Sequence, residues 1–139
     1  MSLKKSQFLE TLELIGKDPN SFADLFYQNI FKASPGLSQT FRNTDLRLQK
    51  AELIKGLIQI FAHIDNDEKL SDFLQELGLR HLCYEVKEQD YPLIERSLKK
   101  TVKEFHGNSW NESLEKYWDE LLNLITHQMI IGSRQVRSA

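Results

Sequence analysis

Apolar side chains recur along this chain with the 3.6-residue period of an α-helix, and strand-like alternation never extends beyond a few residues. The prolines, at positions 19, 35 and 92, and most of the glycines fall between or at the ends of the periodic segments. The pattern therefore predicts an all-α protein of about six to eight helices. We expect residues 1–139 to form one domain.

Three helices are predicted in the first part of the chain. The first covers about residues 3–16, with Phe8 on its apolar stripe. Asp18-Pro19-Asn20 interrupts the pattern, and Ser21 is a suitable N-cap for the second helix. A short third helix begins at Ser34-Pro35, where proline fits the first helical position, and ends near Phe41.

A long helix is predicted over about residues 46–64, with Gly56 in its middle. Glycine there costs about 1 kcal/mol relative to alanine, so we expect close helix packing at Gly56 as the reason for it. The next helix has its apolar stripe at Leu70, Phe73, Leu74 and Leu77. We expect Gly78 to loosen the end of that helix, just before His81.

Two further helices complete the prediction. One begins at the cap Asp90 and ends at Gly107. The last begins near Asn111, and the tail after about residue 132 has no core pattern, so we expect it to fray.

Composition and charge narrow the function classes. The net charge is −2, with positive and negative residues interspersed, so we expect no nucleic acid partner. No stretch approaches the ~20 apolar residues of a membrane span, and the N-terminal residues lack the apolar run of a signal peptide. The single cysteine, Cys83, excludes an internal disulfide framework and fits a reducing compartment. We therefore expect a cytoplasmic protein, either a monomer or a homodimer, that does not enter a membrane.

His81 is the strongest candidate for chemistry. A lone histidine near an apolar helix end is more often structural than a metal ligand, but the surroundings of His81 favour ligation. A ligating histidine needs its second ring nitrogen bonded, which fixes the tautomer. Two groups can do this: a backbone carbonyl one turn earlier, near Leu77, and the hydroxyl of Tyr91, ten residues later. We therefore interpret His81 as an iron ligand.

Four segments, in a fixed order and spacing, identify a family resemblance. They are Phe26-Tyr27-Gln28-Asn29-Ile30-Phe31 with Ser34-Pro35-Gly36-Leu37 and Phe41, then Gln49-Lys50-Ala51-Glu52-Leu53, then His81-Leu82-Cys83-Tyr84-Glu85-Val86 with Tyr91-Pro92, and finally Trp118. Over about residues 22–129 the chain resembles a bacterial globin. Such globins occur as single-domain haemoglobins and as the haem domain of flavohaemoglobins.

The resemblance implies a three-over-three globin fold that binds one haem b. In it His81 matches the proximal iron ligand, Phe41 the phenylalanine against the porphyrin, and Tyr27 and Gln49 the two distal polar residues. Leu53 matches the apolar residue over the iron. The remaining matches are the apolar lining, Leu77, Val86, Ile94, Leu98, Ile125 and Met129, with Arg80 and Arg47 as candidate propionate partners. An exposed arginine, however, is usually only a solvated surface residue.

The distal residues imply a function. Ferrous iron with bound O₂ places partial negative charge on the oxygens, and a hydroxyl or amide donor in a dry pocket stabilises it by about 1–3 kcal/mol each. Tyr27 and Gln49 supply such donors, so we expect tight binding and slow release. We therefore expect reversible binding of O₂ or another diatomic gas, NO or CO, as in oxygen transport or storage. Without the spacing, a packed tyrosine and a solvated glutamine would be the simpler interpretation.

One departure from the resemblance concerns enzymatic activity. Flavohaemoglobins have a glutamate in the last helix that joins the proximal tyrosine and histidine, and here Ser133 stands at that position. A strong peroxidase-like push on the iron is therefore not expected. These 139 residues also leave no room for a flavin and nicotinamide domain. Nitric oxide dioxygenation or peroxide chemistry, with a separate reductase, is the first alternative. A gas sensor or interaction module is the second.

The evidence for a functional role is weaker at the other candidate residues. His63, His106 and His127 have no second ligand at metal-site spacing, and we expect all three to be exposed. Cys83 is interpreted as a small buried thiol. The sequence contains no glycine-rich phosphate loop, zinc signature or hydrolase elbow.

Overall fold

The computed structural model describes residues 3–41, 44–82 and 87–138, without the side chains of residues 40, 79–82 and 135–138. The described residues form seven α-helices and three short 3₁₀ helices, with no strand among them. The α-helices are α1 (Leu9–Lys17), α2 (Pro19–Ala33), α3 (Pro35–Thr40), α4 (Leu46–His63), α5 (Asp67–Leu82), α6 (Tyr91–His106) and α7 (Glu112–Ser138). The 3₁₀ helices are η1 (Lys5–Phe8), η2 (Glu88–Asp90) and η3 (Gly107–Ser109). The all-α prediction is confirmed.

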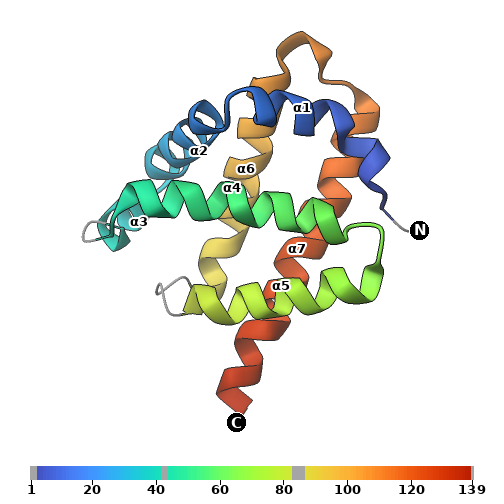
Figure 1. The fold of residues 1–139 in the computed structure, drawn as a ribbon. Helices are drawn as coiled ribbons and strands as arrows, with labels where there is room; N and C mark the ends of the chain where they lie inside the picture. Colours follow the sequence, from blue (N-terminus) through green and yellow to red (C-terminus); the bar gives the residue numbers. More distant parts are fainter. Residues whose placement is uncertain (1–2, 42–43, 83–86, 139) are drawn as a thin grey trace.

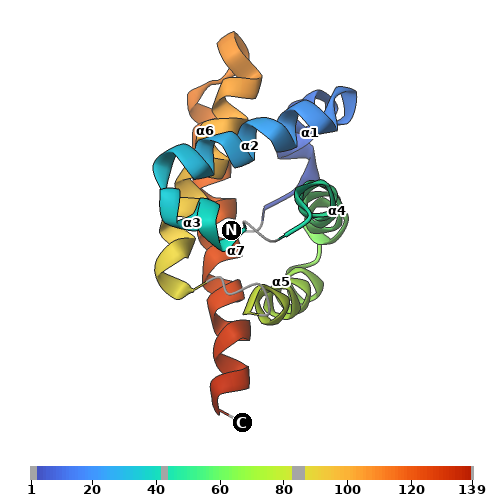
Figure 2. The same ribbon diagram turned by 90° about the vertical axis from the view of Figure 1, so that its left-hand side faces the viewer.

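The helices are arranged in two crossed layers. Figure 1 shows α4 and α5 crossing in front of α6 and α7, while α1 and α2 lie across the top. Figure 2, turned by 90°, shows α4 and α5 together on one side of α6 and α7. This is the three-over-three helical sandwich that the family resemblance implied.

An aromatic cluster anchors the N-terminal segment in the core. The ring of Phe8 lies 5.3 Å from Phe61 of α4 and 5.3 Å from Trp118 of α7, centroid to centroid. All three side chains are buried. Buried aromatic pairs of this kind add about 0.5–1.5 kcal/mol each beyond the area that they remove from water. The cluster therefore ties the start of the chain to helices far away in the sequence.

The second helix begins earlier than predicted. Asp18, and not Ser21, is the N-cap of α2, since its carboxylate accepts hydrogen bonds from the Ser21 amide at 3.1 Å and the Ser21 hydroxyl at 2.7 Å. The cause is Pro19, whose fixed φ suits the first helical position. The predicted start of a short helix at Ser34-Pro35 is confirmed, and Ser34 is its N-cap, because the Ser34 hydroxyl accepts a hydrogen bond from the Leu37 amide at 3.3 Å.

The prediction of close packing at Gly56 is wrong. A Cβ placed on Gly56 would meet nothing within 4 Å, whereas Gly78 and Gly132 have no such room. At these two positions α5 and α7 cross backbone against backbone. The expectation that Gly78 loosens the end of its helix is also wrong, because α5 continues past it to Leu82.

The segment after residue 132, which we expected to fray, is helical in the structure. Helix α7 continues to Ser138. Ser133 is buried and donates its hydroxyl to the Ile130 carbonyl at 2.9 Å. Arg134 Nε lies 2.7 Å from Glu88 Oε1. An internal hydrogen bond and an ion pair to η2 therefore hold this part of the helix.

His106 is buried, contrary to expectation. Its Nε2 is hydrogen-bonded to Thr11 Oγ1 at 2.5 Å, and its Nδ1 lies 3.0 Å from Ser109 Oγ and 3.4 Å from Glu10 Oε1. His127 is exposed as expected, whereas His63 is half-buried, with its ring 5.7 Å from that of Phe73. Cys83 lies outside the described residues.

None of the helices in the described ranges combines the length and the apolar character needed to cross a membrane.

Candidate functional site

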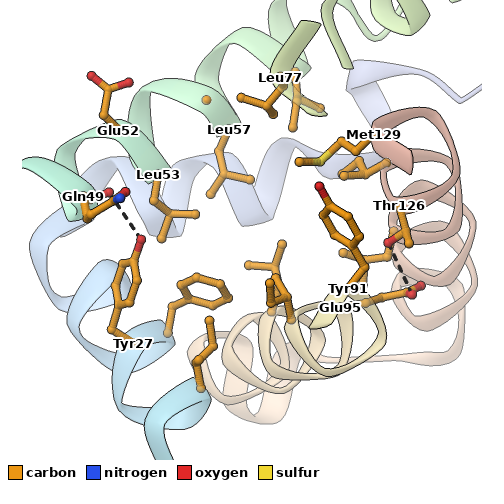
Figure 3. Close-up of a pocket in the computed structure, with 18 of the residues that line it drawn as sticks. Tyr27, Gln49, Glu52, Leu53, Leu57, Leu77, Tyr91, Glu95, Thr126 and Met129 are labelled. Atoms are coloured by element: carbon orange, nitrogen blue, oxygen red, sulfur yellow. Dashed lines mark hydrogen bonds between the residues drawn. The ribbon is translucent and has the colours of Figure 1, made fainter. Parts of the chain in front are cut away.

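A large apolar cavity lies between the helices. It is bounded by α2, α3, α4, α5, α6 and α7 and contains about 1230 Å³ of empty space, its open mouth included. Pockets for small molecules and cofactors usually have mostly apolar walls and few polar groups. The cavity, shown in Figure 3, has a lining of this kind.

The helical period explains why these side chains meet. In α4 the lining residues are Gln49, Glu52, Leu53, Gly56, Leu57 and Ile60, which recur every three or four positions. The same spacing occurs in α6 at Tyr91, Ile94, Glu95 and Leu98, and in α7 at Leu122, Ile125, Thr126 and Met129. Residues with this spacing share one face of a helix. Each helix therefore turns one face to the core and, along part of that face, to the cavity.

Ten residues predicted to bind a cofactor line this one cavity. They are Tyr27, Phe41, Gln49, Leu53, Leu77, Tyr91, Ile94, Leu98, Ile125 and Met129. Positions 80 and 81 belong to the last turns of α5, but the side chains of Arg80 and His81 lie outside the described residues, as does all of Val86. Arg47 does not line the cavity; its guanidinium is exposed and lies 3.8 Å from Asp45.

Ten other residues complete the lining without having been predicted. They are Phe26, Ile30, Leu37, Glu52, Gly56, Leu57, Ile60, Glu95, Leu122 and Thr126. The spacing of these residues could have identified them as lining residues, because most lie three or four residues from a predicted residue on the same helix. Glu52, for example, follows Gln49 by three residues, and Glu95 follows Tyr91 by four.

Tyr27 projects into the cavity from α2. Its hydroxyl donates a hydrogen bond to the backbone carbonyl of Gln49 over 3.4 Å, which is long for such a bond (Figure 3). Its ring packs against Phe41, with 6.1 Å between centroids. Burial raises the pKa of Tyr27 to about 12. The phenol therefore stays protonated at neutral pH and remains a hydrogen-bond donor.

Tyr91 enters the cavity from another wall, at the start of α6. Figure 3 shows its hydroxyl directed into the space between Leu57 and Met129. Burial, and then the carboxylates of Glu88 and Asp90, raise the pKa of Tyr91 to about 12. A second protonated phenol is thus available inside the cavity.

Two carboxylates also belong to the lining. Glu95 is half-buried, and its Oε2 accepts a hydrogen bond from Thr126 Oγ1 at 3.4 Å, which links α6 to α7. Glu52 is exposed, and Figure 3 shows its carboxylate directed away from the other labelled side chains of the lining. Among the described residues, no three His, Cys, Asp or Glu side chains lie close enough together to bind a metal ion directly.

Comparison with known proteins identifies the family. The family model described as Globin matches residues 24–129. The flavohemoprotein of Rhizobium meliloti is 26% identical over 95 residues, which are 67% of this chain and 24% of that protein. The flavohemoprotein of Halalkalibacterium halodurans is 22% identical over 122 residues, covering 86% of this chain and 30% of that protein. The chain thus spans less than a third of the length of these relatives.

A solved structure shares the fold. The crystal structure of a hexacoordinated heme protein from an anhydrobiotic tardigrade at pH 4 superimposes with a TM-score of 0.82. The alignment covers 94% of this chain and 92% of that one, at 16% sequence identity. With the family model matching most of the chain and the same helical arrangement present, the chain belongs to the globin family.

Proposed function

We propose that this globin binds one haem b in the cavity and reversibly binds O₂ or another diatomic gas at the haem iron. The observation that carries the proposal is the arrangement of polar groups in an otherwise apolar cavity. Tyr27 and Gln49 are together on one side, whereas Tyr91 enters from another wall (Figure 3). Such a cavity offers separate donors to the two faces of a planar cofactor.

The residues present fit a haem. The walls are apolar, and Phe41 lies at the corner after α3 with its ring against Tyr27. His81 is the proposed iron ligand. It follows Leu77, a cavity residue, by four positions in the same helix, so the two positions share one helix face. Ile94, Leu98, Ile125 and Met129 provide apolar contacts for the porphyrin, which gain about 25 cal/mol per Å² removed from water.

The bound haem would supply the iron to which a diatomic gas coordinates. Residues of the protein around the iron would then set the rate at which the gas dissociates. The long bond from Tyr27 to the Gln49 carbonyl is weak, so the phenol can give it up for a bound ligand. The Gln49 side chain is a second candidate donor, and a donor in a dry pocket is worth about 1–3 kcal/mol. Leu53 and Leu57 add apolar side chains to the same lining.

On the proximal side Tyr91 is the proposed partner of His81. Ser133 does not replace the flavohaemoglobin glutamate, since a neutral hydroxyl cannot supply a negative charge and this one donates to the Ile130 carbonyl. The imidazole is therefore expected to stay close to neutral, which favours gas binding over peroxide cleavage.

Nitric oxide dioxygenation is a second candidate function, favoured by the similarity to the flavohemoproteins. The matched region is less than a third of those proteins, and turnover would need a reductase to supply electrons to the iron. Rapid loss of NO from the oxygenated protein, repeated in the presence of a reductase, would support this function.

A hemin titration tests the proposed function. Haem-free protein should take up one equivalent of hemin, and the reduced complex should bind CO and O₂ reversibly, as followed by absorption. A folded protein that does not bind hemin would overturn the proposal.

A further inference from the structure

Arg134 and Glu88 form a two-point contact between α7 and η2. Arg134 Nε lies 2.7 Å from Glu88 Oε1, and Arg134 Nη2 lies 3.2 Å from Glu88 Oε2. Both carboxylate oxygens accept from the planar guanidinium, a geometry that fixes direction as well as distance. The side chain of Arg134 is 66% exposed and that of Glu88 is 30% exposed, and ion pairs in contact with water add little stability. The geometry of this pair therefore matters more than its contribution to stability.

Glu88 is joined to Tyr91 through one tight turn. The amide of Tyr91 donates to the Glu88 carbonyl. Two further bonds of 2.9 Å close the turn, from the Asp90 amide to the Lys87 carbonyl and from the Lys87 amide to the Asp90 carboxylate. This turn, η2, leads directly into α6, whose first residue is Tyr91. A displacement of Glu88 would therefore be passed on to the backbone of Tyr91.

The end of α7 lies between the two segments that carry the proposed proximal residues. Gly132 lies directly against the backbone of Gln75 in α5, the helix to which position 81 belongs. Arg134 comes two residues later, about 200° further round the helix, and reaches η2 at the start of α6. Figure 2 shows α7 between α5 and the start of α6. One short stretch of α7 thus contacts both segments.

We propose that Arg134 is a positioning residue, which through Glu88 holds the Tyr91 hydroxyl where it can hydrogen-bond the iron ligand His81. This inference rests on the proposed haem site, in which Tyr91 is the partner of His81. A hydrogen bond to the second ring nitrogen orients a ligating imidazole and raises its basicity. Since hydrogen bonds weaken steeply with poor geometry, a small displacement of Tyr91 changes the iron–histidine bond. Arg134 thus acts from outside the cavity, whose lining does not include it.

The iron–histidine stretch of the ferrous protein tests the positioning. Arg134→Gln and Glu88→Gln each release η2 from α7, and both should move the band in the direction in which Tyr91→Phe moves it. The swapped double variant, Glu88→Arg with Arg134→Glu, again places opposite charges together and should return the band towards its wild-type position. Arg47→Gln is the matched control, because it breaks an exposed ion pair, with Asp45, outside the cavity lining and should leave the band in place.

The two single variants also separate positioning from an effect of charge alone. Burial raises the pKa of Tyr91 and the Glu88 carboxylate adds to this, so Glu88 is close enough to act on Tyr91 by its charge. Arg134→Gln removes a positive charge and Glu88→Gln a negative one, so an effect of charge alone would move the band in opposite directions. Opposite shifts, no shift in either single variant, no recovery in the swapped variant, or an equal shift in Arg47→Gln would overturn the proposal.

Hydrogen exchange at the Tyr91 amide gives a readout that does not depend on the iron. This amide donates to the Glu88 carbonyl, so Arg134→Gln should speed its exchange by up to roughly fivefold, the effect expected for loss of an exposed ion pair. Arg47→Gln should leave the rate unchanged. An unchanged rate in Arg134→Gln would contradict the link between Arg134 and Tyr91. A folded protein that does not bind hemin would instead overturn the proposed function.

Discussion

Gly78 of α5 lies directly against the backbone of Met129 in α7. A Cβ on Gly78 would be 2.8 Å from Met129 Cα, and a Cβ on Gly132 would be 2.6 Å from Gln75 Cα. The two contacts are reciprocal, so the helices cross with no side chain between them. Met129 lines the cavity, and position 81 follows Gly78 by three residues. The crossing therefore sets the distance between the proposed ligand helix and one cavity wall.

Replacing either glycine should destabilise the fold. Gly78→Ala and Gly132→Ala each force a methyl group into backbone, and overpacking of this kind costs about 1–3 kcal/mol or more. Urea unfolding measures the effect. Gly16→Ala is the control, because nothing lies within 4 Å of its Cβ position, and alanine should stabilise α1 by up to about 1 kcal/mol. Equal effects at all three positions would contradict the close crossing.

Tyr27→Phe should speed O₂ dissociation. Loss of a donor worth about 1–3 kcal/mol corresponds to an increase of roughly 5- to 150-fold in the rate. Stopped-flow displacement of O₂ by CO measures it. Tyr117→Phe is the control, since Tyr117 lies in α7 and packs near Phe8, away from the cavity. A rate equal to that of the wild type would exclude Tyr27 from contact with the bound gas.

The protein should lose stability below about pH 6.5 through His106. Trp118 Nε1 donates to Thr11 Oγ1 at 3.3 Å, so the hydroxyl proton of Thr11 is free to point at His106 Nε2, which then accepts as the unprotonated nitrogen. Burial lowers the pKa of His106, and this outweighs the opposing attraction of the Glu10 carboxylate.

The direction in which the free energy of unfolding changes with pH follows from proton binding. Just below the ordinary histidine pKa of 6.5, the unfolded chain takes up more protons at position 106 than the folded one. The free energy of unfolding therefore falls as the pH drops through this range towards the folded-state pKa. Urea titrations between about pH 7.5 and 5.5 should show a steeper loss for the wild type than for His106→Gln. His127→Gln, an exposed control, should keep the wild-type slope.

The proposed contacts on the proximal side of the haem lead to a spectroscopic prediction. The iron–histidine stretch in the resonance Raman spectrum should be that of a neutral imidazole. Tyr91→Phe should shift this band, because it removes the hydroxyl directed into the cavity. Ser133→Ala should leave it in place, since the Ser133 hydroxyl is used by Ile130. A peroxidase-like frequency in the wild type would refute this description of the proximal side.

Helix periodicity was enough to predict the fold class and most helix boundaries. The predicted site residues on α4, α6 and α7 came from the family resemblance, and they line one cavity because residues on one helix face meet the same space. Contacts between segments that are distant in the sequence could not be predicted from helix periodicity. His106 is buried because Thr11, 95 positions earlier, reaches it. The hydrogen bond from Thr126 to Glu95 likewise joins two helices. The close crossing at Gly78 is formed with the backbone of Met129 in α7. The sequence pattern of one helix does not identify the helix that packs against it.

Imidazole rescue of His81→Gly tests the central proposal most directly. The ferrous wild-type protein should show an iron–histidine stretch, His81→Gly should lose it, and added imidazole should restore an iron–imidazole band. His63→Gly is the control, because His63 packs against Phe73 outside the cavity lining, and it should keep the wild-type band. If His81→Gly retains the wild-type iron–histidine band without imidazole, His81 is not the iron ligand and the proposed site is wrong.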